Sequence, residues 1–304
     1  MKPRVASFYE NRLGRNDGNP LYVTNVLKRD YADRIEFHHL IPDPALQLEA
    51  LGRFDCHFWI DWGEDGLTGV LPYTPIRPPH PNVYWASDTH LGPAYRFALA
   101  DDCDAVFFAQ QRAVEEYGRG EWLPHAVEPQ AYNPAAIYAA TPEALATAAS
   151  VVRAKRWDLC FVGHLNTADR IAALDRLFKE FPSSWWASRR PGRSFERAAD
   201  IYTQSRVVFN HAVQDDVNMR VFEVLATRSC LLTSEVPTLK ALFTDGVHLV
   251  TYRDLDEAVD KARYYLAHDD ARERIAAAGY AEVMAKHTMA HRVRRLLDVA
   301  GLSC

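Results

Sequence analysis

The sequence contains no long hydrophobic run. No segment approaches the ~18 consecutive apolar residues that a membrane-spanning helix needs. The opening residues, Met1–Phe8, lack the apolar core of a secretory signal peptide. Cysteine is scarce, with five residues that lie far apart, form no Cys-x-x-Cys pair and mostly occupy apolar runs, as buried free thiols do. These features predict a cytoplasmic protein without a membrane span.

Several catalytic and cofactor motifs are also missing. The sequence has neither the Gly-x-Gly-x-x-Gly fingerprint of dinucleotide-binding proteins nor the Gly-x-Ser-x-Gly turn of serine hydrolases. The net charge of −5 does not point to a nucleic-acid-binding protein. We therefore expect no bound cofactor and no nucleophilic serine.

The sequence does contain two successive series of short apolar strands. Its 304 residues, 48% hydrophobic and 25% charged, have the composition of a globular protein, and their number suggests about two domains of ~150 residues. In the first half we expect strands at Arg4–Tyr9, Ile35–Ile41, Asp55–Asp61, Asn82–Ala86, Asp104–Ala109 and Glu121–Pro124. In the second half we expect strands at Asp158–Val162, Trp185–Ala187, Arg206–Phe209, Cys230–Thr233 and His248–Tyr252. Helical or irregular segments between the strands predict two α/β domains, residues 1–150 and 151–304.

The segment from Phe209 to Glu235 carries the most information about function. An apolar strand is followed by a polar loop, Asn210–Asn218, and then by a helix that begins near Met219. Ligands of parallel sheets bind at this kind of position, where a strand ends and the positive end of a helix dipole favours a phosphate. Arg220 could bind such a phosphate, and Glu223, one turn further on, could accept hydrogen bonds from two ribose hydroxyls. Each residue taken singly also suits a solvated helix end.

This segment resembles the nucleotide-sugar site of GT-B glycosyltransferases, in particular the "glycosyl transferases group 1" domain of CgeB-like proteins. The shared Arg-x-Phe-Glu-x-x-Ala pattern comprises Arg220, Phe222, Glu223 and Ala226. Retaining GT-B families also carry two Glu separated by seven residues. Glu223 matches the second of them, while Asp215 stands in the place of the first and is one methylene shorter.

The resemblance implies two Rossmann-like domains that face a central cleft. The first domain would bind the acceptor, and the second would bind a nucleotide-sugar donor, its final helix crossing back to the first domain. The resemblance assigns the donor to these residues: Gly163, His164, Arg189, Asn218, Met219, Arg220 and Glu223. A helix dipole and Arg220 would stabilise the leaving diphosphate without a metal. In agreement, neither Asp215-Asp216 nor Asp101-Asp102-Cys103-Asp104 provides an Asp-x-Asp motif after a strand, the arrangement that metal-dependent glycosyltransferases of the other main fold use.

Asp88 and His90 follow a predicted strand in the first half and are candidates for the reacting centre, together with Asp215. Asp88 suits equally well a role as the N-cap of the following helix. The remaining candidates lie in loops that follow the first and third strands and would face the acceptor: Gly14, Asn16, Asp17, Gly18, Asp61 and Glu64. Ordinary surface turns would explain these loops as well.

The end of the chain suggests a coupling between the domains. We expect a helix break near His287-Thr288, followed by an amphipathic helix with Arg292, Arg294 and Arg295 on its polar face. Ala135–Arg153 and this last helix would form a hinge. Deletion from Thr288 onward would then spare the second domain while lowering stability and turnover.

The sequence thus predicts a metal-independent glycosyltransferase, by family resemblance a retaining one, with a nucleotide-sugar donor and an undetermined acceptor. Two alternatives remain open. One is a non-catalytic GT-B-like protein that binds a nucleotide or saccharide. The other is a sugar-nucleotide epimerase of the same fold.

Overall fold

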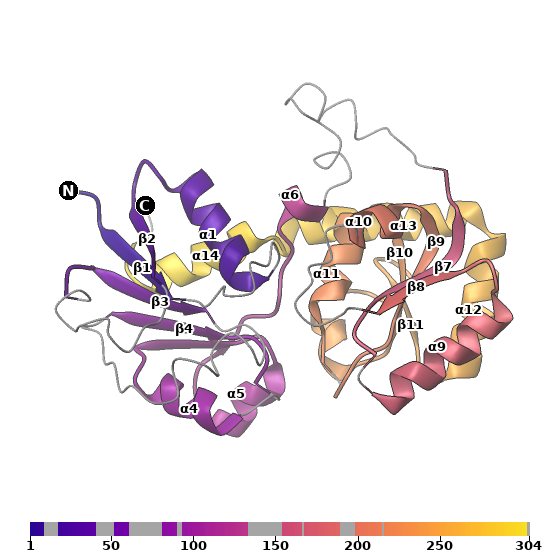
Figure 1. The fold of residues 1–304 in the computed structure, drawn as a ribbon, viewed down its shortest axis with the longest axis horizontal. Helices are drawn as coiled ribbons and strands as arrows, with labels where there is room; N and C mark the ends of the chain where they lie inside the picture. The colour runs from indigo at the N-terminus through magenta and orange to yellow at the C-terminus, as the bar shows by residue number, and fades with distance from the viewer. Residues whose placement is uncertain are drawn as a thin grey trace. The chain divides into compact units, whose positions relative to one another are not determined.

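The chain forms two compact α/β units (Figure 1). The computed structural model describes residues 1–8, 18–40, 52–60, 81–89, 93–132, 154–165, 167–188, 198–214 and 216–302. The first unit comprises Met1–His125 and Met289–Cys304, and the second comprises Ala126–Thr288. This division differs from the expected boundary at residue 150, because residues 126–132 already belong to the second unit. The segment Ala135–Arg153 of the expected hinge lies outside the described residues.

The first unit is built on a parallel six-stranded sheet with the strand order β2-β1-β3-β4-β5-β6. The strands are β1 (Arg4–Phe8), β2 (Glu36–Leu40), β3 (Cys56–Ile60), β4 (Asn82–Ala86), β5 (Ala105–Phe108) and β6 (Glu121–Trp122). The helices described between them are α1 (Asn19–Asp30), α4 (Pro93–Asp101) and α5 (Gln111–Tyr117). All six predicted strands are confirmed to within two residues. Every residue of β3 and β4 is buried, as expected for central strands covered on both faces.

The last helix, α14 (Met289–Val299), packs against α1 within the first unit (Figure 1). The helix before it, α13 (Asp269–Lys286), ends at Lys286, so the predicted break near His287-Thr288 is confirmed. The placement of Arg292 on the polar face was wrong, because its side chain is only 6% exposed. Its Nε donates to the carbonyl of Pro124 at 2.7 Å and its Nη2 to that of His125 at 3.0 Å. Arg292 is thus a buried cation that donates to backbone carbonyls of a distant segment. The helical pattern of the sequence does not indicate such partners.

The second unit is built on a parallel five-stranded sheet with the order β11-β10-β9-β7-β8. Its strands are β7 (Trp157–Gly163), β8 (Trp185–Ser188), β9 (Ser205–Asn210), β10 (Cys230–Ser234) and β11 (Val250–Tyr252). Its helices are α6 (Pro129–Tyr132), α9 (Ala168–Glu180), α10 (Ala198–Thr203), α11 (Met219–Ala226), α12 (Leu255–Ala267) and α13. The five predicted strands are confirmed. A short 3-10 helix, Pro237–Ala241, follows β10.

The alternation of side chains along the strands explains how helices cover both faces of this sheet. Leu159 and Phe161 of β7 join a core with Ala173 and Leu177 of α9, to which Val259 of α12 also belongs. The intervening residues of β7, which are also buried, point to the opposite face, because successive side chains of a strand alternate. On that face α11 packs against α13 and α10. Both faces are therefore largely apolar, and the polar residues of the candidate site described below lie at the edge where the strands end.

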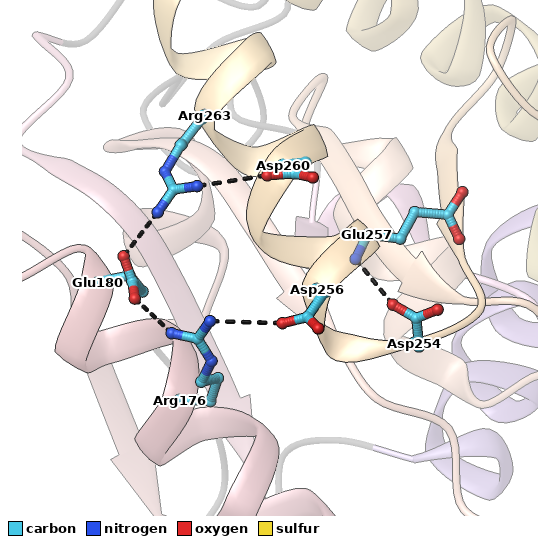
Figure 2. A network of polar contacts seen from close by, with 7 residues as sticks. All are labelled: Arg176, Glu180, Asp254, Asp256, Glu257, Asp260 and Arg263. Carbon is cyan, nitrogen blue, oxygen red and sulfur yellow. Dashed lines mark hydrogen bonds and ion pairs between the residues drawn. The ribbon is translucent and has the colours of Figure 1, made fainter.

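An ion-pair network joins α9 to α12 on the surface (Figure 2). Arg176 pairs with Glu180 on its own helix and with Asp256 of α12 at 3.4 Å. Arg263 of α12 reaches Glu180 at 2.8 Å and Asp260 at 3.3 Å. Single exposed pairs contribute little to stability, whereas these pairs form a network that connects the two helices. The first turn of α9, at the other end of the helix, contributes a residue to the candidate functional site described below.

No helix in the described part of the chain is both long enough and apolar enough to cross a membrane.

Candidate functional site

The candidate site lies in the second unit, at the edge where β7 and β9 end. Gly163 is the last residue of β7, and Asn210 is the last residue of β9. The loop after β9 leads into α11, whose N-cap is Asn218 in an extended conformation. Helix α11 is anchored by buried apolar residues, among them Phe222 at 0% exposure. The sheet thus holds two loops and one helix N-terminus close together.

Arg220, in the first turn of α11, extends over the end of β7. Its Nε donates to the carbonyl of Val162 at 2.7 Å, and its Nη1 donates to Oδ1 of Asn210 at 2.6 Å. The guanidinium carbon lies 4.4 Å from the centre of the Phe161 ring. The predicted phosphate-binding arginine is therefore held in one orientation by both strand ends.

Gly163 makes this orientation of Arg220 possible. A Cβ atom added at residue 163 would lie 1.9 Å from Nη2 of Arg220 and 2.9 Å from its guanidinium carbon. Such distances are far inside van der Waals contact, so any side chain here would displace the guanidinium. Gly163 was predicted to line the donor site. The structure explains why a glycine suits this position: any side chain would displace the guanidinium of Arg220.

The buried side chain of Asn210 connects the elements of the site. Its Nδ2 donates to Oγ1 of Thr233 at 2.9 Å, and its Oδ1 accepts from Nδ2 of Asn218 at 3.3 Å as well as from Arg220. The side chain of Asn218 makes no capping bond to α11. Asn210 is 1% exposed, so losing one of these partners would leave a polar atom without water.

Arg170, in the first turn of α9, was not predicted. Its Nη1 donates to the carbonyl of His164 at 3.0 Å and its Nη2 to that of His211 at 2.8 Å, so it ties the loop after β7 to the loop after β9. Its guanidinium carbon lies 5.7 Å from the centre of the Phe161 ring, which Arg220 also contacts. The sequence offered one indication that Arg170 belongs to the site: it lies at a helix start, seven residues after Gly163.

The two arginines concentrate positive charge at this edge of the sheet. Burial, and then the neighbouring charge of Arg220, lower the pKa of Arg170 to about 10. Arg170 therefore stays cationic at neutral pH despite the cost of bringing two like charges together. An anion bound beside them would offset that cost, and the N-terminus of α11 adds partial positive charge. The arrangement suits a phosphate or diphosphate group.

His211 lies in the same loop and is half-buried. Its Nδ1 lies 2.8 Å from the hydroxyl of Tyr252, which also donates to the carbonyl of Asn210 at 3.1 Å. Burial, and then the charge of Arg170, lower the pKa of His211 below its ordinary value of 6.5. The ring is thus mainly neutral near neutral pH and can offer one donor and one acceptor.

Glu223 lies one turn after Arg220 on the same helix, as its spacing predicted. Its Oε1 accepts a hydrogen bond from the hydroxyl of Tyr132 at 2.8 Å. Tyr132 belongs to α6, which packs against α11, and is 5% exposed. Tyr132 was not expected here, because 91 positions separate it from its partner.

The other predicted residues are distributed as follows. His164 is exposed next to Gly163, and Met219 is partly buried at the start of α11. Asp88 and Gly18 belong to the first unit, where Asp88 is partly buried after β4 and Gly18, with a φ of 112°, precedes α1. The following predicted residues lie outside the described residues: Gly14, Asn16, Asp17, Asp61, Glu64, His90, Arg189 and Asp215.

The turn that carries Asp88 is held from the neighbouring strand. Oε1 of Gln110, which follows β5, accepts from Oγ1 of Thr89 at 2.9 Å and from its backbone N–H at 3.3 Å. Nε2 of Gln110 donates to the carbonyl of Ser87. Asp88 is therefore presented on a fixed turn at the carboxyl end of β4. Among the described residues of both units, no group of three His, Cys, Asp or Glu side chains could hold a metal ion.

Residues 170–298 match a family model described as "Glycosyl transferase-like". The match includes Arg170, Asn210, Arg220 and Glu223 of the candidate site, while Gly163 and Tyr132 lie before it. No curated protein sequence matches the chain significantly.

Solved structures that resemble the chain cover both units. HepE of Anabaena in complex with UDP and glucose has a TM-score of 0.63 at 10% identity, covering 98% of this chain and 99% of that one. An α-glucosyltransferase in complex with UDP and a 13-mer DNA containing an HMU base has a TM-score of 0.65 at 8% identity, covering 99% and 100%. Sucrose-phosphate synthase of Thermosynechococcus elongatus has a TM-score of 0.61 at 10% identity, covering 98% and 99%.

The fold is therefore that of GT-B glycosyltransferases, with two Rossmann-like α/β units. The predicted fold class is confirmed. The family match points to the predicted class of enzyme, a glycosyltransferase. The description of the family model does not name the CgeB-like group that the Arg-x-Phe-Glu motif suggested.

Proposed function

We propose that this protein transfers a sugar from a nucleoside diphosphate sugar to an acceptor, using the edge of β7 and β9 as its donor site. The observation that carries the proposal is the pair of guanidinium groups, Arg170 and Arg220, that both lie over the Phe161 ring near the N-terminus of α11. This pair would bind the diphosphate. Glu223, one turn along α11, would accept hydrogen bonds from the ribose hydroxyls.

A diphosphate leaving group gains negative charge as the bond to the sugar breaks. Fixed positive groups stabilise that charge most effectively when they are already oriented, because no reorganisation is then needed during the reaction. Hydrogen bonds to Val162 and Asn210 hold Arg220, and hydrogen bonds to His164 and His211 hold Arg170. We accordingly propose that transfer needs no metal ion.

UDP-linked sugars are the first donors to test, because HepE and the α-glucosyltransferase were solved with UDP. The sequence spacing of Asp215 and Glu223, which matches that of the two Glu in retaining GT-B families, supports retention of the anomeric configuration. Asp88, on its fixed turn in the first unit, is the described candidate for a group at the reacting sugar. The anomeric configuration of the product, followed by NMR, would test retention directly.

The test of the donor site is calorimetric titration with UDP, ADP and GDP, followed by assay of sugar release from the matching nucleotide sugar. Glu223→Ala should weaken nucleotide binding about 10-fold or more, because charge-assisted hydrogen bonds contribute ~1.5–3 kcal/mol each. Glu116→Ala, in the first unit, is the matched control and should bind normally. Unchanged affinity in Glu223→Ala would remove the ribose assignment. Tight nucleotide binding without any sugar release would favour a non-catalytic binding protein instead.

A further inference from the structure

We infer that Tyr132 is a positioning residue that sets the orientation of the Glu223 carboxylate for the donor ribose. This inference rests on the proposed function. Its basis is the 2.8 Å hydrogen bond from the Tyr132 hydroxyl to Oε1 of Glu223, made by a side chain that is 5% exposed. Tyr132 lies outside residues 170–298, so the matched family segment does not contain it.

The backbone holds Tyr132 firmly next to α11. Helix α6 is a single turn that begins at Pro129, and the carbonyl of Glu128 accepts from the backbone N–H of Ala131 at 3.0 Å and of Tyr132 at 3.3 Å. Just before this turn, the N–H of Val127 donates to the carbonyl of His287 at 3.1 Å. The phenol therefore belongs to a turn whose backbone hydrogen bonds lie within the second unit.

The direction of the hydrogen bond follows from the chemistry of the two groups. An ionised carboxylate only accepts, and a phenol has a single proton to donate. A hydrogen bond to a charged acceptor is stronger than a neutral one, so Tyr132 selects one orientation of the carboxylate. Glu223 is partly exposed and its unbranched side chain has several rotamers, so a hydrogen bond that favours one of them reduces its conformational freedom.

Fixing the carboxylate before the donor arrives should increase affinity. When ribose hydroxyls bind a mobile carboxylate, the side chain that carries it loses conformational entropy. This loss makes binding weaker. When Tyr132 orders the carboxylate during folding, Glu223 has already lost this conformational entropy before the donor binds. The expected effect falls on donor affinity, since the ribose hydroxyls do not change during transfer and the interaction is the same in ground and transition states.

The test is Tyr132→Phe, which keeps the ring and removes only the hydroxyl. UDP, ADP and GDP are titrated, and the nucleotide that binds the wild-type protein is used throughout. We expect affinity to fall about 3- to 10-fold and KM for the corresponding nucleotide sugar to rise in parallel, with kcat nearly unchanged. The melting temperature should remain close to that of the wild type. Tyr264→Phe, at a half-exposed tyrosine of α12, is the matched control and should leave affinity unchanged.

A double-mutant cycle with Glu223→Gln isolates the interaction between the two side chains. The inference predicts that Tyr132→Phe has a much smaller effect in the Glu223→Gln background. An equal loss of affinity in both backgrounds would overturn it, since Tyr132 would then act through another group. Weakened binding in Glu223→Ala together with normal binding in Tyr132→Phe would also overturn it while leaving the donor site intact. Normal binding in both variants would remove the ribose assignment itself.

Discussion

The guanidinium of Arg220 occupies the space in which a side chain of Gly163 would begin. Nη2 of Arg220 lies 1.9 Å from the position of a Cβ on residue 163. The two residues belong to different elements, the end of β7 and the first turn of α11, so the absence of one side chain creates the place for the other. This steric dependence gives the first prediction.

Gly163→Ala should weaken nucleotide binding about 10-fold, because the methyl group pushes Arg220 away from Val162 and Asn210. Calorimetric titration with UDP measures the loss. Arg220→Ala provides the control background: there, the guanidinium is gone and Gly163→Ala should add little. A full additional loss in that background would mean that the methyl group disturbs the site in some other way.

Arg170→Lys should weaken nucleotide binding even though the positive charge is kept. A guanidinium presents several N–H groups in a fixed plane and bonds both His164 and His211, whereas an ammonium is a compact charge on a flexible stem. Arg176→Lys, further along the same helix and on the surface, is the control and should bind as the wild type does. If Arg170→Lys retained full affinity, the charge alone would matter and the link between the two loops would be irrelevant to binding.

His211 should make the stability of the protein sensitive to mild acid. Its pKa in the folded state is lowered, so the unfolded chain binds the proton first as the pH falls below about 6.5. The free energy of unfolding therefore decreases through that range, and the decrease is complete once the pH lies below the folded-state pKa. In His211→Asn, urea unfolding at about pH 7.5 and about pH 5 should show a smaller loss than in the wild type. The surface variant His268→Asn should keep the full loss, and an identical loss in all three proteins would exclude His211 as a cause.

Helix α14 should stabilise the first unit in particular. Leu296 is 0% exposed on α14, which packs against α1. Leu296→Ala should lower the free energy of unfolding by about 2–5 kcal/mol, the range for large-to-small changes in a core. Hydrogen exchange should accelerate in α1 and β1 more than in the sheet of the second unit. Arg294→Ala, at an exposed position on the same helix, should change stability by no more than about 0.5 kcal/mol. Faster exchange confined to the second unit would contradict the assignment of α14.

Sugar release from the nucleotide sugar should continue in excess EDTA. The proposed donor site supplies positive charge from Arg170, Arg220 and the N-terminus of α11, so a divalent cation is not required to stabilise the diphosphate. Loss of turnover in EDTA, restored by magnesium or manganese, would refute this prediction.

The sequence by itself determined the two sheets and the approximate place of the candidate site. Strands such as β3, β4 and β7 are recognisable because parallel strands buried on both faces form short apolar runs. In a parallel sheet all strands end at the same edge, so polar residues that follow strands were expected to gather there. Arg220 and Glu223 could be paired from their spacing alone, because residues three apart lie on the same face of a helix.

The tertiary structure alone decided which residues from distant segments complete the site. The bond from Arg220 to Val162 spans 58 positions, and that from Tyr132 to Glu223 spans 91. The burial of Arg292 depends on carbonyls more than 160 positions away, so a helical pattern assigned it to solvent. Periodicity records which face of an element is apolar, whereas the partner of a polar side chain depends on how the chain folds back. For that reason Arg170, Tyr132 and the steric role of Gly163 emerged only from the folded chain.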